Sequence, residues 1–227
     1  MLPLSFLGHY FWAALIFLSF YAVYRKYQKN QIEMLKNFYM FFLVWSVGFF
    51  LPLASIITAG YYLESNTLMS LGYVLPHFFA FVSIGYLWKV QSAINFPEYS
   101  KLFWLFVAYG GIVAGYGLYV MPEVSVVQGS MSYGSSLLSM MIPLGMTLSA
   151  VLISGSSFYS AYITEGDSRK KLGLIGIGTL IALVLASVMN NMGYEVLGGV
   201  MNLLWISIFL SVVYWEKIRG KIVSWRS

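Results

Sequence analysis

The sequence predicts an all-α integral membrane protein with seven transmembrane helices. Its 227 residues are 59% hydrophobic and only 9% charged, and the mean hydropathy is +0.77. A soluble domain would carry roughly 25% charged residues. Seven apolar runs are long enough to cross a hydrocarbon core about 30 Å thick. They are residues 4–24, 38–59, 67–88, 102–121, 136–162, 171–191 and 197–215.

The basic residues predict the orientation of these spans. All thirteen fall in alternate connections or after the last span, whereas the opposite connections contain only Glu64, Glu123 and Glu195. Lysine and arginine stay on the cytoplasmic side of a membrane, so we expect the N-terminus outside and the C-terminus in the cytoplasm. No basic region precedes Arg25, so residues 1–24 are interpreted as a retained span rather than a signal peptide. The basic residues are Arg25, Lys26, Lys29, Lys36, Lys89, Lys101, Arg169, Lys170, Lys171, Lys217, Arg219, Lys221 and Arg226.

Composition also excludes several classes of function. The net charge of +5 is explained by membrane topology, so the lipid bilayer is the expected partner and nucleic acid is not. The chain has no cysteine, which excludes disulfides and thiolate sites. The spans contain no carboxylate pair and no HExxH motif, and Gly-Ser-Ser at 155–157 has no histidine nearby. We therefore expect no enzyme activity.

An internal repeat is suggested by three matches in the same order. The first two spans share the patterns Phe-Tyr-x-x-Tyr and Leu-x-Leu-Ala-Ser with the fifth and sixth, and the third and seventh both open on Leu-Gly. Apolar helices built from few residue types also match by chance, which is the alternative. The matched segments are 20–24 with 158–162, 51–56 with 183–188, and 71–75 with 197–201.

The repeat predicts a 3+1+3 plan within one seven-helix membrane domain, 1–227. Residues 1–89 form the first three-helix unit, 102–121 a linker helix, and 136–217 the second unit. Matched helices cross the membrane in the same direction, so the two units are parallel. Transporters with parallel repeats place their substrate site near the midplane, between the halves.

This plan, the outside N-terminus and the chain length resemble the sugar-transporting SWEET proteins, and more loosely the opsins. The resemblance is architectural and covers the whole chain. The sequence has no Pro-Gln pair of the kind that the wider PQ-loop group carries, and its last span has no lysine for a retinal Schiff base. Bacterial sensor-kinase membrane regions share a similar length and topology. No family is assigned on this basis.

A histidine in the third span marks the candidate site. Asn66, Ser70, Tyr73 and His77 lie on one helical stripe, which continues inward through Ala80 and Ile84. Polar groups in a membrane face the bundle interior or a wet cavity. We therefore expect an outward-opening pocket that binds a small-molecule ligand. Its predicted lining is Ser70, Tyr73, His77, Asn190, Asn191 and Asn202.

Three other roles for His77 stay open. It could form a purely structural hydrogen bond to a neighbouring helix, act in a proton relay, or ligate a metal or haem. Haem would need His9, the only other histidine, which lies at a different depth. Copper(I) would favour methionine sulfur, but methionine is a common gap filler in apolar helices. We expect no cofactor and no metal.

Glycines and prolines in the spans predict close helix packing and helix kinks. Gly111 and Gly115 form a GxxxG pattern, which permits close helix approach, either within the chain or in a homo-oligomer or with another membrane partner. Pro76 and Pro143 lie near the middle of their spans and predict kinks.

Three functions follow, in order of preference. The first is a passive carrier of a small neutral or apolar solute, because the spans hold no deep charged residue for ion coupling. The second is a sensor or receptor module that binds a ligand from outside and signals through a separate cytoplasmic partner. The third is a structural subunit of a membrane complex. The plasma membrane is the expected location.

Overall fold

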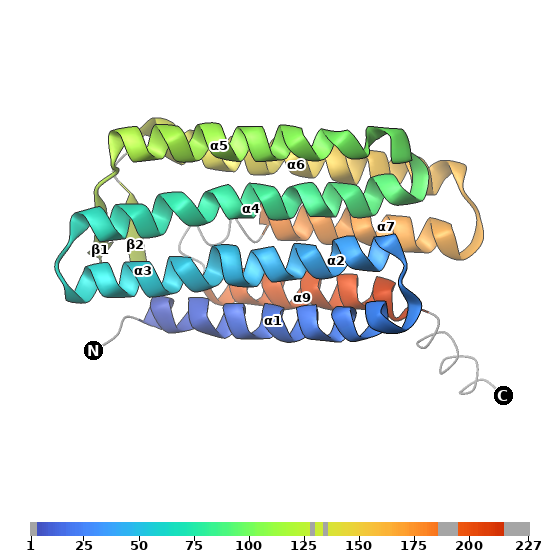
Figure 1. Ribbon diagram of the computed structural model, residues 1–227, viewed down its shortest axis with the longest axis horizontal. Helices are drawn as coiled ribbons and strands as arrows, with labels where there is room; N and C mark the ends of the chain where they lie inside the picture. The colour runs from blue at the N-terminus through green and yellow to red at the C-terminus, as the bar shows by residue number, and fades with distance from the viewer. Residues whose placement is uncertain (1–3, 128–129, 134–135, 186–194, 216–227) are drawn as a thin grey trace. The chain divides into compact units, whose positions relative to one another are not determined.

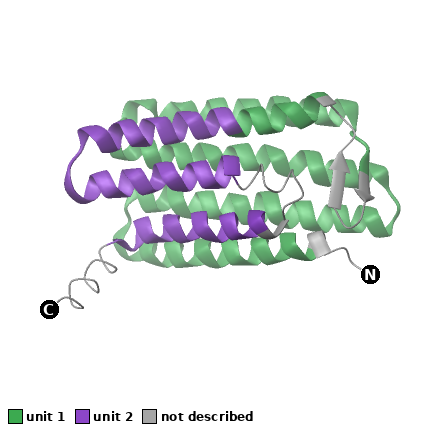
Figure 2. Cartoon of the chain, turned by 180° about the vertical axis from the view of Figure 1, so that it is seen from behind, with its two compact units in different colours: residues 1–146 green, residues 147–227 purple. Residues whose placement is uncertain are grey.

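The computed structural model describes residues 4–127, 130–133, 136–185 and 195–215. The chain divides into two compact units, residues 1–146 and 147–227, coloured separately in Figure 2. Apart from one short two-stranded hairpin, the described chain is helical. The Asn190 and Asn191 side chains and the basic tail from Lys217 onward lie outside the described residues.

Five helical segments are long and apolar enough to cross a membrane, which supports an integral membrane protein. They are Leu7–Asn30, Glu33–Tyr62, Asn66–Ile94, Pro97–Val120 and Leu137–Ile163. The described residues add one shorter apolar helix, Leu197–Val213. The predicted sixth span, 171–191, runs beyond the described residues, so the count of seven stays a prediction.

Unit 1 is a row of antiparallel rods. Helix α1 (Leu4–Asn30) packs against a continuous rod formed by α2 (Glu33–Leu43), the π-helix η1 (Val44–Phe50) and α3 (Leu51–Tyr62). That rod packs against α4 (Asn66–Asn95), and α4 packs against α5 (Phe103–Val120), which follows the 3-10 segment η2 (Pro97–Leu102) (Figure 1). Helix α4 therefore has a neighbour on each side, as does the α2–η1–α3 rod.

Close packing of α4 depends on glycines at its contacts. A Cβ atom added to Gly72 would lie 2.7 Å from Cγ1 and 2.9 Å from the backbone nitrogen of Ile57 in α3. On the other side, a Cβ on Gly117 of α5 would lie 2.7 Å from a methyl group of Val74. Missing side chains let helix backbones approach closely, which is how helices associate in an apolar solvent.

A β-hairpin follows α5 and is the exception to the all-α prediction. Strand β1 (Val124–Val127) pairs antiparallel with β2 (Ser130–Tyr133), with Val124 opposite Tyr133. The segment lies between the predicted spans 102–121 and 136–162. Its valines suit extended backbone, and pairing the two strands satisfies their backbone groups without a helix.

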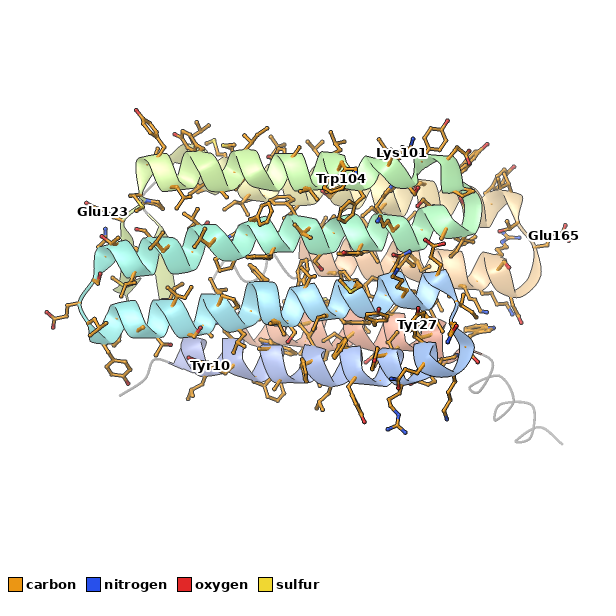
Figure 3. The ribbon with its side chains drawn as sticks, in the orientation of Figure 1. Tyr10, Tyr27, Lys101, Trp104, Glu123 and Glu165 are labelled. Atoms are coloured by element: carbon orange, nitrogen blue, oxygen red, sulfur yellow. The ribbon has the colours of Figure 1, made fainter. Side chains whose placement is uncertain are left out.

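The basic residues of unit 1 gather at one end of its rods, together with Glu33 and Glu98, whereas the other end carries only glutamates among the described residues. Figure 3 shows Glu123 at one end of the rods and Lys101 at the other. Glu64 lies in the α3–α4 turn, at the same end as Glu123, while Arg25 and Lys29 lie in the last turns of α1. The middle of the rods instead exposes large apolar side chains, such as Leu18 and Ile112, as expected of a surface that faces lipid.

Unit 2 contains the later part of α6 (Ser136–Ile163), α7 (Gly166–Leu180), the π-helix η3 (Ile181–Leu185) and α9 (Glu195–Val213). Helix α7 packs against α9, where Gly178 meets the ring of Phe209. It also meets α6, where Gly176 lies against Phe158. The middle helix of this unit therefore contacts both of the others.

Candidate functional site

The first two residues of the polar stripe connect α4 to the segment after α5. The Asn66 side-chain oxygen accepts a hydrogen bond from the backbone N–H of Val124 at 3.1 Å. The buried Ser70 hydroxyl donates to the carbonyl of Pro122. These two side chains hold the start of the hairpin against α4, so their hydrogen-bonding groups serve the fold.

His77 has one ring nitrogen engaged and one without a described partner. Its Nδ1 lies 2.6 Å from the carbonyl oxygen of Tyr73, one turn earlier in α4. A carbonyl oxygen only accepts hydrogen bonds, so Nδ1 carries the proton, and the neutral ring presents Nε2 as an acceptor. Nε2 forms no hydrogen bond with any described residue, and the side chain is only 8% exposed. The ring is thus oriented to accept a hydrogen bond.

Aromatic rings form two walls around His77. The Tyr73 ring centroid lies 4.7 Å from that of His77 at 65°, and the Phe49 centroid lies 5.3 Å away at 73°. Phe49 belongs to the π-helix η1, a geometry that occurs often at functional sites. Gly48 of the same segment approaches the Cβ of Phe79 in α4, which brings Phe49 within reach of the histidine.

Pro76 precedes His77 and weakens the helix there. Proline has no N–H, so the carbonyl one turn earlier, that of Gly72, loses its helical partner. Helix α4 nevertheless continues through Pro76, and α6 continues through Pro143. The kinks predicted at these positions stay predictions.

Asn202 belongs to unit 2 and has its own local partner. Its side-chain oxygen accepts a hydrogen bond from Nε1 of Trp205 at 2.9 Å, and both residues are buried in α9. His77, Ser70 and Tyr73 belong to unit 1. A shared pocket that joins Asn202 to His77 therefore stays a prediction.

The GxxxG pattern lies on an exposed face of α5. A Cβ added to Gly111 or Gly115 would meet no described atom within 4 Å. The glycines that contact α4 are instead Gly110, which meets Phe81, and Gly117. No described residue packs closely against Gly111 or Gly115, so the helix contact predicted there stays a prediction.

The second histidine does not join the His77 ring in a described contact. His9 in α1 lies with its ring centroid 6.1 Å from that of Phe50. Within the described part of the chain, no three His, Cys, Asp or Glu side chains gather in a way that could hold a metal ion. Nothing in this geometry adds support for haem or copper.

Gln91 is a polar residue that the sequence reasoning missed. It lies seven residues after Ile84 and fourteen after His77, so it continues the same stripe at the basic end of α4. The side chain is 0% exposed, and neither its amide oxygen nor its amide nitrogen has a hydrogen-bond partner. An unpaired buried polar group costs about 1–3 kcal/mol. Extending the heptad spacing past Ile84 would have found it.

Unit 2 contains two similar groups on α6. The hydroxyls of Ser157 and Ser160 are buried and have no partner. Other helical hydroxyls in the chain, such as those of Ser19 and Thr179, donate to the carbonyl one turn earlier. The small size of Ser157 suits close helix packing, but packing does not account for the unused hydroxyl.

Comparison with known proteins assigns no family to the chain. No protein-family model, no curated protein and no solved structure matches it.

Proposed function

We propose that the protein is a passive carrier of a small neutral solute, with the site at His77 in the outer half of α4. One observation carries this proposal: the Nε2 atom of a buried histidine is held as an acceptor and has no described partner. The complementary solute carries an O–H or N–H group and an apolar part that fits between aromatic rings. The candidate spans hold no charged side chain near His77, which favours movement without ion coupling.

The proposed architecture has seven spans, with the basic end of unit 1 in the cytoplasm. Lysine and arginine at that end, and glutamate at the other, fit the rule that basic residues stay inside. The N-terminus is then outside and the C-terminus cytoplasmic, in the plasma membrane. In this orientation His77 lies about 16 Å from the outer start of α4, at ~1.5 Å per residue.

Two features support a parallel repeat in this carrier. The second helix of each predicted three-helix repeat contains a π-helical segment: η1 ends one residue before Leu51, and η3 includes Leu183, the residue aligned with it. Each repeat also joins its first two helices through a serine hydroxyl, which comes from the second helix in the first repeat and from the first helix in the second. Ser46 donates to the carbonyl of Ala13 at 2.7 Å, and Ser154 donates to that of Gly176 at 2.9 Å.

The test is the equilibration of small neutral polyols and amides across liposomes that contain the purified protein. We expect saturable flux that falls about tenfold in His77→Ala, since one lost hydrogen bond of ~1.4 kcal/mol is a factor of ten. His77→Gln keeps an acceptor near the position of Nε2 and should retain part of the flux. His77→Asn keeps only a short donor toward the Tyr73 carbonyl and should not retain flux. Asn202→Ala tests the predicted contribution of unit 2.

Ser83→Ala is the matched control. Ser83 is fully buried in α4, but its hydroxyl donates to the carbonyl of Phe41, away from His77. Its substitution should leave flux unchanged. If all three His77 variants show wild-type flux, the histidine has only a structural role in helix packing and the carrier proposal fails.

A sensor or receptor is the second candidate, favoured by the packing below His77. On the next turns of α4, the side chains of Ala80, Ile84 and Leu87 are fully buried. A ligand could therefore bind from outside without a path to the other end in this conformation. Saturable binding that His77→Ala weakens, without flux of any solute in the panel, would select this function.

A further inference from the structure

We propose that the Gln91 amide is a second binding station of the carrier, at the basic end of α4, for the hydroxyl or amide groups of the same solute. This inference rests on the proposed carrier function and adds to it the chemistry of the opposite end. A glutamine amide offers one acceptor oxygen and two N–H donors. Here all of them are buried and unpaired.

The position of Gln91 relative to His77 fits two stations on one face. Fourteen residues advance about 21 Å along an α-helix and return to nearly the same side, at ~1.5 Å and ~100° per residue. The residues between them on this face, Ala80 and Ile84, are apolar and fully buried. Trp88 also lies on this face, but its indole N–H already donates to the carbonyl of Tyr99 at 2.8 Å. A solute that leaves Nε2 of His77 thus meets no unpaired polar group on this face of α4 until it reaches Gln91.

The two sequence neighbours of Gln91 are equally buried, but their side chains have no unpaired hydrogen-bonding group. Val90 and Ser92 are also 0% exposed. Val90 is apolar, and the Ser92 hydroxyl donates to the carbonyl of Lys89 at 3.3 Å. Of these three consecutive buried residues, Gln91 alone has hydrogen-bonding groups left unused. Buried polar groups are paired with protein or water in most folded proteins, so we infer that water or solute reaches this amide when the basic end opens.

The same feature occurs independently on α6 of unit 2. Ser157 and Ser160 lie in the last two turns of that helix before the Arg169–Lys171 segment, and their buried hydroxyls are unpaired. Each unit thus contains unused polar groups near its basic connection. A carrier needs such groups, because its solute must also be released on the cytoplasmic side.

The experiment uses the full chain, which contains no cysteine of its own. Gln91→Cys and Val90→Cys each introduce a single thiol at adjacent, fully buried positions. A small charged methanethiosulfonate reagent is added to proteoliposomes from either side. We expect Gln91→Cys to react at least about tenfold faster than Val90→Cys from the basic-end side, and a transported solute to slow the reaction. Equal, slow reaction of both thiols overturns the inference.

A second variant separates this inference from the carrier proposal. Gln91→Leu keeps the volume and removes the amide. Flux that falls about tenfold, with solute binding from the outside retained, supports a second station. Unchanged flux together with a raised melting temperature identifies the amide as only an unpaired group and overturns it. If the wild type carries no solute, the carrier proposal fails, and the thiol comparison still decides whether Gln91 meets water.

Discussion

The two ends of α4 differ in how their polar side chains are used. Near the hairpin, Asn66 and Ser70 both hydrogen-bond to the backbone of the segment that follows α5. At the basic end, Gln91 is more deeply buried than His77 and has no partner for either amide atom. A polar stripe along a membrane helix is therefore not equivalent to a binding site, because most of its members can be committed to holding the fold.

His77 combines a hydrogen-bonded atom with an unpaired one. Its Nδ1 is committed to the Tyr73 carbonyl, and its Nε2 has no described partner. Only the uncommitted atom is available to a ligand. Substitutions at Gly72, Ser70 and Ser83 measure how strongly the contacts of α4 stabilise unit 1.

Gly72→Ala should have the largest effect on stability. The added Cβ would lie 2.7 Å and 2.9 Å from two Ile57 atoms, one of them in the backbone. Overpacking of this kind costs about 1–3 kcal/mol, and we expect a value near the upper end because backbone atoms move little. Denaturant unfolding in detergent micelles measures it. Gly115→Ala, with open space around the new methyl group, should be neutral or stabilising by up to about 1 kcal/mol. Equal effects in the two variants would contradict the close approach of α3 and α4.

Ser70→Ala should have an intermediate effect that is concentrated near the hairpin. The substitution removes the buried donor to the Pro122 carbonyl and should cost about 1–2 kcal/mol. Limited proteolysis within residues 123–135 should become faster as the segment is released from α4. The control is Ser55→Ala, since the exposed Ser55 hydroxyl donates only to its own helix, at the Leu51 carbonyl. Unchanged proteolysis in Ser70→Ala would mean that this bond does not hold the segment.

Ser83→Ala should have the smallest effect. It removes an interhelical hydrogen bond of 2.9 Å to the Phe41 carbonyl, and such bonds in membrane proteins are worth about 0.6 kcal/mol on average. The same unfolding measurement applies. If Ser83→Ala lowers the free energy of unfolding more than Ser70→Ala does, the contact between α4 and α2 stabilises unit 1 more than the contact between α4 and the hairpin segment.

Much of the fold was predictable because it depends on composition along the chain. Helices long enough to cross a membrane follow from apolar runs, since no other open structure satisfies its own backbone groups in lipid. The predicted spans 38–59 and 67–88 lie within Glu33–Tyr62 and Asn66–Ile94. The hairpin was not predicted, because each of its strands is only four residues long. The π-helical segments, which depend on side-chain packing, were missed for a similar reason.

The candidate site was predictable only in part. Ser70, Tyr73 and His77 are buried, as expected of polar residues that share one stripe of a membrane helix, and Asn202 is buried too. Gln91 was overlooked because the stripe becomes apolar at Ala80 and Ile84 before it reaches the amide. The sequence also did not predict which polar side chains are already hydrogen-bonded within the fold, because the partners of Ser70 and Asn66 come from more than fifty residues away.

The membrane environment, the apolar helices and the placement of every basic residue in alternate connections or in the tail can be read from the amino-acid sequence. These properties depend on the transfer of each segment from water to lipid, which is additive along the chain. The roles of individual polar groups depend on packing: Ser70 holds the segment after α5, Nε2 of His77 is left as an acceptor, and the Gln91 amide is unpaired. Hydrogen bonding is decided by which atoms meet at about 3 Å, and distant segments meet at that distance only after the helices have packed.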